Sequence, residues 1–154
     1  MPASTNPFAL YLDTSALVKV FTSEDGSALV RGLLSGPAAI LLTSRLAYTE
    51  AAVSLARMVH LGRILASDLP EHLGALDNYW EESIQEVALS EEVLCDARQL
   101  AQRFPLRTYD AIHLASARAA KRMLRGVFEG ELRFLAFDSG LVKAARSIGF
   151  VIAG

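Results

Sequence analysis

The chain has a single cysteine among its 154 residues, and it has no long apolar run. Cys95 alone cannot form an internal disulfide, and no Cys or His pair has the C-x-x-C or H-E-x-x-H spacing of a zinc site. Apolar runs such as Ala38 to Leu42 are far shorter than the roughly 18 residues that predict a membrane span. We therefore expect neither a disulfide scaffold, nor such a zinc site, nor a membrane partner.

Targeting and nucleotide-binding signals are missing as well. Residues 1–7 contain no Lys or Arg and no apolar stretch, so no secretory signal is recognisable there. Together with the near absence of cysteine, this favours a cytoplasmic protein. The glycine-rich signatures G-x-G-x-x-G and G-x-x-x-x-G-K do not occur, which leaves dinucleotide and P-loop sites without support.

The chain does contain enough apolar material for one folded core. Apolar residues make up 52% of the sequence and charged residues 21%, which excludes a disordered chain. A chain of this length typically folds as one domain. We predict a single domain over residues 1–154.

Short apolar runs alternate with segments of helical periodicity along the whole chain. The runs typical of strands are residues 8–13, 38–42, 84–89, 133–137 and 150–152. A short helix capped by Thr14 or Ser15 follows the first run. Further helices are predicted at residues 25–34 (ending before Gly36-Pro37), 44–60, 68–82, 90–104, 108–125 and 140–148, with Ser44 and Ser90 as the caps of two of them. This alternation predicts an α/β fold, a three-layer α/β/α arrangement with a mostly parallel central sheet of about five strands.

The charges are unevenly distributed, although the net charge is only −2. Residues 1–97 contain 5 basic and 13 acidic side chains, whereas residues 98–154 contain 10 basic and 4 acidic ones. A basic face would suit a phosphate backbone, but solvated faces rich in Lys and Arg are also common, so both interpretations stay open. Trp80 lies in the acidic stretch 68–96 and is predicted to be a core or interface residue rather than a platform for bases. The candidates for phosphate contacts are Arg107, Arg118, Lys121, Arg122 and Arg125.

Four carboxylates stand out by their positions. Asp13 follows the first predicted strand and Asp138 the fourth, and ligands of open α/β sheets bind beyond such strand ends. Glu50 has mainly apolar or small helical neighbours, where a Glu is expected to have a partner or a metal ion. Asp110 is near the start of a predicted helix, where it also favours the positive end of the helix dipole. Taken singly, each also fits a helix cap or a solvated surface acid.

Taken together, these carboxylates from separate elements would meet at one end of the sheet. Like charges a few ångströms apart repel each other or force protonation, whereas a hard divalent ion stabilises such a cluster. All-oxygen ligands suit Mg²⁺ or Mn²⁺. His113, one turn after Asp110, either orients that carboxylate or is a packed or capping histidine.

Four short segments carry these acids: LDTSALVK at residues 12–19, TEA at 49–51, YDAIHLA at 109–115 and FDSGLVKAA at 137–145. In this order and spacing they resemble the motifs of the PIN-domain family, and more narrowly those of VapC-type ribonuclease toxins of type II toxin–antitoxin systems, over about residues 8–152. The chain departs from the pattern at Ala136, where a Thr or Ser often stands, and no further carboxylate follows Asp138 at residues 139–140.

The resemblance implies a PIN-like fold and a metal-dependent endoribonuclease that hydrolyses RNA phosphodiester bonds with Mg²⁺ or Mn²⁺. It implies that Asp13, Glu50, Asp110 and Asp138 are catalytic and hold the metal, and that Ser15 is the catalytic hydroxyl residue beside the first Asp. It also implies a homodimer and a cognate VapB-like antitoxin that blocks the site. The alternative is a catalytically inactive PIN-like module that binds RNA or a protein. The presence of all four acids favours the enzyme.

Overall fold

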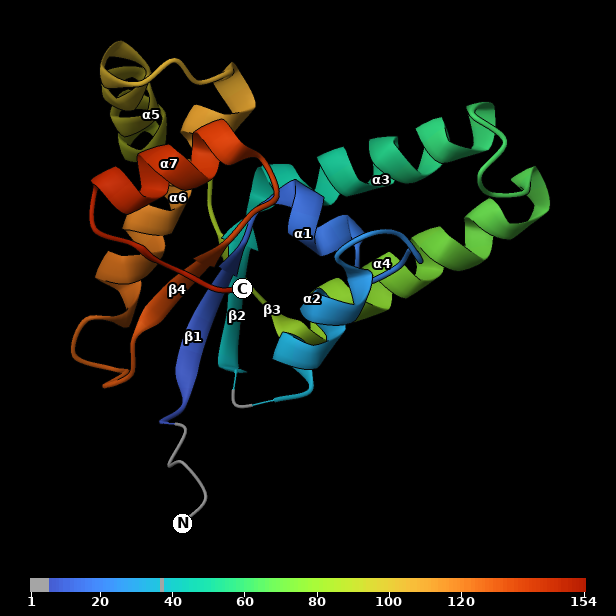
Figure 1. Cartoon of the computed structure of the whole chain (residues 1–154), viewed down its shortest axis with the longest axis horizontal. Helices are drawn as coiled ribbons and strands as arrows, with labels where there is room; N and C mark the ends of the chain where they lie inside the picture. The colour runs from blue at the N-terminus through green and yellow to red at the C-terminus, as the bar shows by residue number, and fades with distance from the viewer. Residues whose placement is uncertain (1–5, 37) are drawn as a thin grey trace.

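A parallel sheet forms the centre of the computed structural model, which describes residues 6–36 and 38–154 (Figure 1). The strands pair in the order β3-β2-β1-β4-β5, and every pairing is parallel. The prediction of a mostly parallel sheet of about five strands is therefore confirmed. The strands are β1 (Phe8–Leu12), β2 (Ala38–Ser44), β3 (Ile84–Val87), β4 (Leu132–Leu135) and β5 (Val151–Ile152).

Helices cover both faces of this sheet, which confirms the predicted three-layer α/β/α arrangement (Figure 1). One face carries α1 (Thr14–Val18), α2 (Ser27–Leu34), α3 (Arg45–His60) and α4 (Leu69–Ser83), with the 3-10 turn η1 (Ala66–Asp68) before α4. The other face carries α5 (Glu91–Arg103), α6 (Thr108–Leu124) and α7 (Ser139–Ser147). A separate apolar core fills each side. No helix in the described part of the chain is long and apolar enough to span a membrane.

The central strand β1 supplies side chains to both cores, which explains its unbroken apolar sequence. Every one of its residues is at most 3% exposed. Ala9 and Tyr11 pack on the α5–α7 side, and the alternate residues Phe8, Leu10 and Leu12 pack on the α1–α4 side, because successive side chains of a strand point to opposite faces. Burial on both faces holds β1 firmly, and with it the residue just beyond its carboxyl end.

Polar caps begin the helices that follow the strands. Ser44 and Ser90 cap α3 and α5 as predicted, each accepting a backbone N–H with its hydroxyl. The prediction that Thr14 or Ser15 caps the first helix is wrong. Asp13 is the N-cap, because it keeps an extended backbone (ψ 175°) while Thr14 is already helical.

Some predicted boundaries shift by two residues. Strand β4 ends at Leu135 instead of Phe137, because the Phe137 N–H donates to the Ser15 hydroxyl and takes no part in strand pairing. Helix α2 begins at Ser27 instead of residue 25, because Gly26 has a left-handed φ of 88° that a helix cannot include. Strand β3 ends at Val87 instead of residue 89. Residues 1–5 and Pro37, part of the predicted helix end, lie outside the described residues.

The acidic and basic parts of the sequence meet where α5 packs against α6. Arg118 lies 3.2 Å from Asp96, and Arg122 lies 3.0 Å from Glu92, so two of the predicted phosphate contacts are ion-paired within the chain. Trp80 is buried, which confirms it as a core residue. The charge asymmetry seen in the sequence therefore stabilises a helix pair in part, instead of forming one uninterrupted basic face.

Truncation of Leu114 tests the core on the α5–α7 side. Leu114→Ala is expected to lower the free energy of unfolding by about 2–5 kcal/mol, because a fully buried side chain is replaced by a cavity. Met123→Ala is the matched control on the exposed face of the same helix, with an expected change below about 0.5 kcal/mol. Equilibrium unfolding in denaturant measures both. Similar losses for the two variants would contradict this packing.

Candidate functional site

The predicted site residues gather at the carboxyl edge of the sheet. Asp13 follows β1 and Asp138 caps α7 shortly after β4, and these two strands are hydrogen-bonded neighbours. Glu50 lies in the second turn of α3, the helix that starts directly after β2, the other neighbour of β1. Asp110 lies in the first turn of α6. The open end of a parallel sheet thus collects acids from four helix starts.

Asp13 is the most enclosed of these acids, with a residue exposure of 5%. Its Oδ1 accepts hydrogen bonds from the Ser15 hydroxyl at 2.7 Å and from the Ala16 N–H at 2.9 Å. Burial raises the pKa of the Asp13 carboxyl above its usual value, and the negative charge of Asp110 adds to this, while the hydrogen bonds and His113 offset only part of it. An ionised Asp13 is therefore strained electrostatically and would be relieved by a nearby cation.

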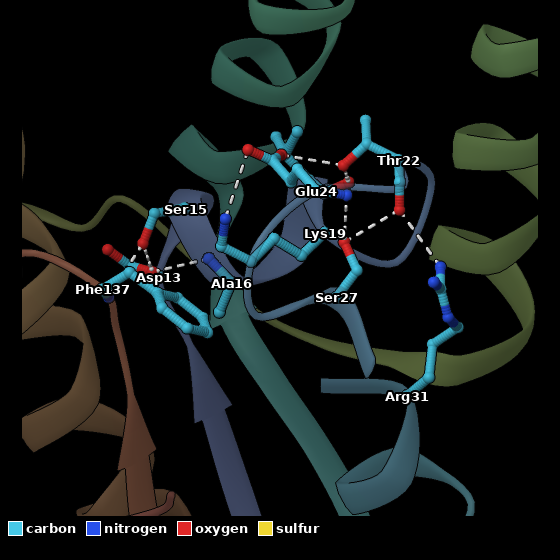
Figure 2. A network of polar contacts seen from close by, with 10 residues as sticks. Asp13, Ser15, Ala16, Lys19, Thr22, Glu24, Ser27, Arg31 and Phe137 are labelled. Carbon is cyan, nitrogen blue, oxygen red and sulfur yellow. Dashed lines mark hydrogen bonds and ion pairs between the residues drawn. The ribbon is translucent and has the colours of Figure 1, made fainter. Parts of the chain in front are cut away.

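Ser15 ties the loops after β1 and β4 together. Its hydroxyl donates to Asp13 and accepts the Phe137 N–H at 3.1 Å, one residue before Asp138 (Figure 2). The Phe137 ring lies beneath the ammonium group of Lys19, 4.7 Å from the ring centroid. This cross-link holds the two strand-end carboxylates, Asp13 and Asp138, in a common framework.

The Phe137 ring also rests directly on the loop before α2. A Cβ added to Gly26 would lie 2.5 Å from a carbon of this ring, so the close approach requires glycine. Lys19 forms an ion pair with Glu24 at 3.3 Å, and the Ser27 hydroxyl donates to the Thr22 carbonyl, which together close this loop (Figure 2). The loop therefore supports the segment that carries Asp138.

Glu50 is held by a chain of buried polar groups that sequence analysis did not identify. Thr14 Oγ1 donates to Glu50 Oε2, and His113 Nε2 lies 2.8 Å from the same oxygen. His113 is 2% exposed, and its Nδ1 lies 3.0 Å from the Tyr11 hydroxyl. Burial raises the pKa of that hydroxyl, so Tyr11 keeps its proton. Tyr11, His113 and Glu50 thus form one hydrogen-bonded chain from the core to the edge of the sheet.

This arrangement keeps Glu50 ionised. Burial alone opposes the charged form of Glu50, but the hydrogen bonds from His113 and Thr14, with the nearby positive charge of Arg107, outweigh it and lower the pKa of this carboxyl. His113 is thus a packed histidine, one of the two interpretations that the sequence offered, and the carboxylate that it orients is Glu50 and not Asp110. A histidine on the buried face of a helix needs polar partners, and that was the available signal.

Arg107 joins the two remaining acids. Its Nε lies 2.9 Å from Asp110 Oδ2, and its Nη2 lies 3.4 Å from Asp138 Oδ2. The sequence had placed Arg107 only among the phosphate contacts, although its spacing of three residues from Asp110 at a helix start is typical of an ion pair. The four acids are therefore brought to one edge, but each is bound to partners within the chain, and Asp110 and Asp138 share Arg107.

The donor chemistry of this edge suits a hard divalent cation, because all four acids offer carboxylate oxygens. As the side chains stand, residues 6–36 and 38–154 contain no group of three or more Asp, Glu, His or Cys that could hold one ion. Asp13, Glu50 and Asp110 each use one oxygen for their contacts within the chain, and in Asp13 and Glu50 that oxygen anchors the residue to the fold. Asp138 uses both oxygens, Oδ1 as the cap of α7 and Oδ2 toward Arg107. The residues therefore fit a metal by their chemistry and by their location, but Arg107 forms ion pairs with the acids at the starts of α6 and α7.

The family model of the PIN domain matches residues 10–146. The chain belongs to the PIN-domain family. This PIN domain is 38% identical over 110 residues to ribonuclease VapC45 of Mycobacterium tuberculosis (strain CDC 1551 / Oshkosh), which covers 71% of this chain and 75% of that protein. It is 30% identical over 144 residues to ribonuclease VapC47 of the same strain, covering 94% and 95% of the two chains. The predicted likeness to PIN domains of the VapC type is confirmed.

Solved structures share the fold at low sequence identity. Mycobacterium tuberculosis VapC20, described as a sarcin-ricin loop cleaving toxin, superposes with a TM-score of 0.65 at 14% identity, over 93% of this chain and 97% of that one. A toxin–antitoxin complex from Klebsiella pneumoniae gives a TM-score of 0.58 at 17% identity, over 85% and 87%. These likenesses confirm the PIN-like α/β fold.

Alanine at position 26 tests the support under Phe137. Gly26→Ala is expected to lower the free energy of unfolding by about 2–5 kcal/mol, since it combines a left-handed backbone with a clash against the ring. Gly62→Ala is the matched control, because Gly62 also has a positive φ (67°) but has nothing near its would-be Cβ, so only about 1–2 kcal/mol of backbone strain is expected. In a Phe137→Ala background most of the difference between the two substitutions should disappear, because only Lys19 Cδ, at 3.3 Å, then remains near the added Cβ of residue 26. An undiminished difference there would refute the clash with the ring.

The raised pKa of Asp13 predicts how stability depends on pH. A carboxyl whose pKa is higher in the folded state than in the unfolded state destabilises the fold once it ionises, so its contribution is favourable at low pH and is lost as pH rises through the folded value. Relative to wild type in EDTA, Asp13→Asn should therefore gain stability as pH rises above about 4, the usual pKa of an aspartate. Denaturant unfolding at several pH values measures this. A constant difference between the two proteins would contradict a raised pKa.

Proposed function

We propose that this PIN domain is an endoribonuclease that hydrolyses RNA phosphodiester bonds with Mg²⁺ or Mn²⁺, and that it is the toxin of a VapBC-type pair. The observation that carries the proposal is the set of four acids, Asp13, Glu50, Asp110 and Asp138, at the carboxyl edge of the sheet. The VapC ribonucleases among its relatives support the same activity.

In this proposal the four acids hold the metal and the remaining residues position them. The chemistry that a bound ion supplies in such a site is activation of a water molecule and neutralisation of charge on the scissile phosphate. Ser15 and the Ala16 N–H fix Asp13 through one oxygen, and His113 with Thr14 fixes Glu50 through one oxygen. Because the Ser15 hydroxyl donates to Asp13, its role is to orient that carboxylate and to join the Phe137 segment, and no protein nucleophile is needed.

The RNA path is best supported near Arg107. Its side chain is 78% exposed and lies beside Asp110 and Asp138, so it is within reach of a phosphate at the same edge. Lys121 is eleven residues further along α6 than Asp110, a distance of about 16 Å along a helix. Lys121 and the more distant Arg125 would therefore contact RNA away from the scissile bond, if the substrate extends that far.

The proposal also includes protein partners. The neighbour from Klebsiella pneumoniae is a toxin–antitoxin complex, which supports a cognate VapB-like antitoxin for this chain. We further propose a homodimer, as the family resemblance implies. Purification of the chain together with the product of the neighbouring reading frame, followed by measurement of the mass of the complex, tests both partners.

Cleavage of end-labelled cellular RNA tests the proposed activity. Purified protein should cut RNA with Mg²⁺ or Mn²⁺ and lose the activity in EDTA. Asp13→Asn and Asp138→Asn should each lower the rate by more than about 100-fold, since even the partners of metal ligands are typically worth 10–100-fold. Glu92→Gln is the control, because it removes an exposed acid that pairs with Arg122 on the side of α5. Its rate should match wild type.

Two results would contradict the proposal in different ways. Equal cleavage in EDTA, or full activity of both Asn variants, would exclude the metal mechanism at these acids. RNA binding without cleavage under every metal condition would favour the alternative, an inactive PIN-like module that only binds RNA or a protein.

A further inference from the structure

We infer that Arg107 is a built-in counter-ion of the acidic site, and that a divalent cation has to displace it in order to bind. Arg107 therefore weakens the affinity of the site for metal. This inference rests on the proposed function, since it concerns the same four acids, and it adds a residue that sets how much metal the site requires.

The two contacts of Arg107 join separate elements. Asp110 lies in the first turn of α6, three residues after Arg107, whereas Asp138 is the N-cap of α7 and lies 31 residues away in the sequence. The flat guanidinium group offers donors in a fixed fork, so Nε and Nη2 reach the two carboxylates together. Such a fork compensates two acids at once, which a single surface ion pair does not.

On Asp138 the oxygen that contacts Arg107 is the one that a metal would need. Asp138 Oδ1 already accepts the Leu141 N–H at 2.8 Å as the cap of α7. Its second oxygen, Oδ2, is the one that faces Arg107, at 3.4 Å. A metal bound by Asp138 without unravelling the start of α7 would therefore use Oδ2. On Asp110 the contact with Arg107 is likewise made by Oδ2, at 2.9 Å.

Electrostatic repulsion prevents Arg107 and a divalent cation from occupying the same carboxylate oxygens together. A guanidinium group stays protonated at every physiological pH, so it cannot give way by losing its charge. A divalent ion at the same oxygens would repel it, because two positive charges a few ångströms apart are unfavourable. The long side chain of Arg107 is 78% exposed and can leave by rotating into solvent. Metal binding and release of Arg107 are thus linked, and each opposes the other.

Comparison with other arginines shows what is particular to Arg107. Arg118 and Arg122 also form ion pairs, but their partners Asp96 and Glu92 lie on α5 and are not among the four acids. Their removal changes the charge of the protein by the same amount as removal of Arg107. They therefore separate a local competition from a general effect of net charge.

Calorimetric titration with Mn²⁺ in a chelator-free buffer at fixed ionic strength tests the inference. Arg107→Gln should bind Mn²⁺ roughly two- to thirtyfold more tightly than wild type, the range expected from the loss of two ion pairs. Arg107→Lys keeps the charge and loses the fork, so it should lie between the two. Arg122→Gln, the control of equal charge, should stay within about twofold of wild type.

A second measurement does not depend on metal. In EDTA, Arg107→Gln should melt at a lower temperature than wild type, because Asp110 and Asp138 lose their counter-ion. Asp138→Asn should reduce this effect, since it removes one of the two acids that Arg107 compensates. An equal effect of Arg107→Gln with and without Asp138 would overturn the inference.

The outcomes also separate this inference from the proposed function. Unchanged or weaker Mn²⁺ binding by Arg107→Gln, with clear binding by wild type, would overturn the role of Arg107 and leave the metal site standing. Absence of Mn²⁺ binding by wild type and by every Arg107 variant would overturn the metal site itself, and the inference with it. Binding by Arg107→Gln alone would support the inference in its strongest form.

Discussion

Repulsion among carboxylates at the open end of a parallel sheet is the constraint on which the rest of this edge depends. Asp13 and Asp138 follow neighbouring strands, and Asp110 contributes to the raised pKa of Asp13. Such a cluster is stable only where positive charge or hydrogen-bond donors compensate it. The start of α1, Arg107 and His113 at and within α6, and the first turn of α7 supply these donors. The contacts of the site residues therefore serve largely to compensate the negative charge of the four acids.

In three of the four acids, one carboxylate oxygen is anchored to the fold by hydrogen bonds. Asp13 and Asp138 each use Oδ1 to cap a helix, and Glu50 uses Oε2 to bond with His113 and Thr14. An acid anchored by one oxygen has little rotational freedom, so its other oxygen is held at a defined place. The interpretations of Asp13 and Asp138 as helix caps or as site residues, which looked like alternatives in the sequence, are therefore compatible.

Sequence reasoning succeeded where the signal was local. The caps Ser44 and Ser90, strand β1 and the alternation of strands and helices depend on residues close together in the chain, and these were predicted, whereas the cap of the first helix was not. The contacts of His113 with Glu50 and of Phe137 with Gly26 join residues 63 and about 111 positions apart. No periodicity or spacing in the sequence indicates that these residues are in contact. The contacts depend on the strand order, which places β1 between β2 and β4.

The partners of charged residues are also difficult to predict from the sequence. A count of basic residues after position 97 suggested a basic face, yet ionic partners are chosen in space and not along the chain. Arg118 pairs with an acid 22 residues earlier, whereas Arg107 reaches an acid 31 residues later. The first pair fastens α6 to α5, and the second places a cation among the acids of the site. Arg107, at the start of α6, and Arg118, within the same helix, therefore have different effects. The effect of each charge depends on which carboxylate it faces, and on whether a ligand needs that carboxylate as well.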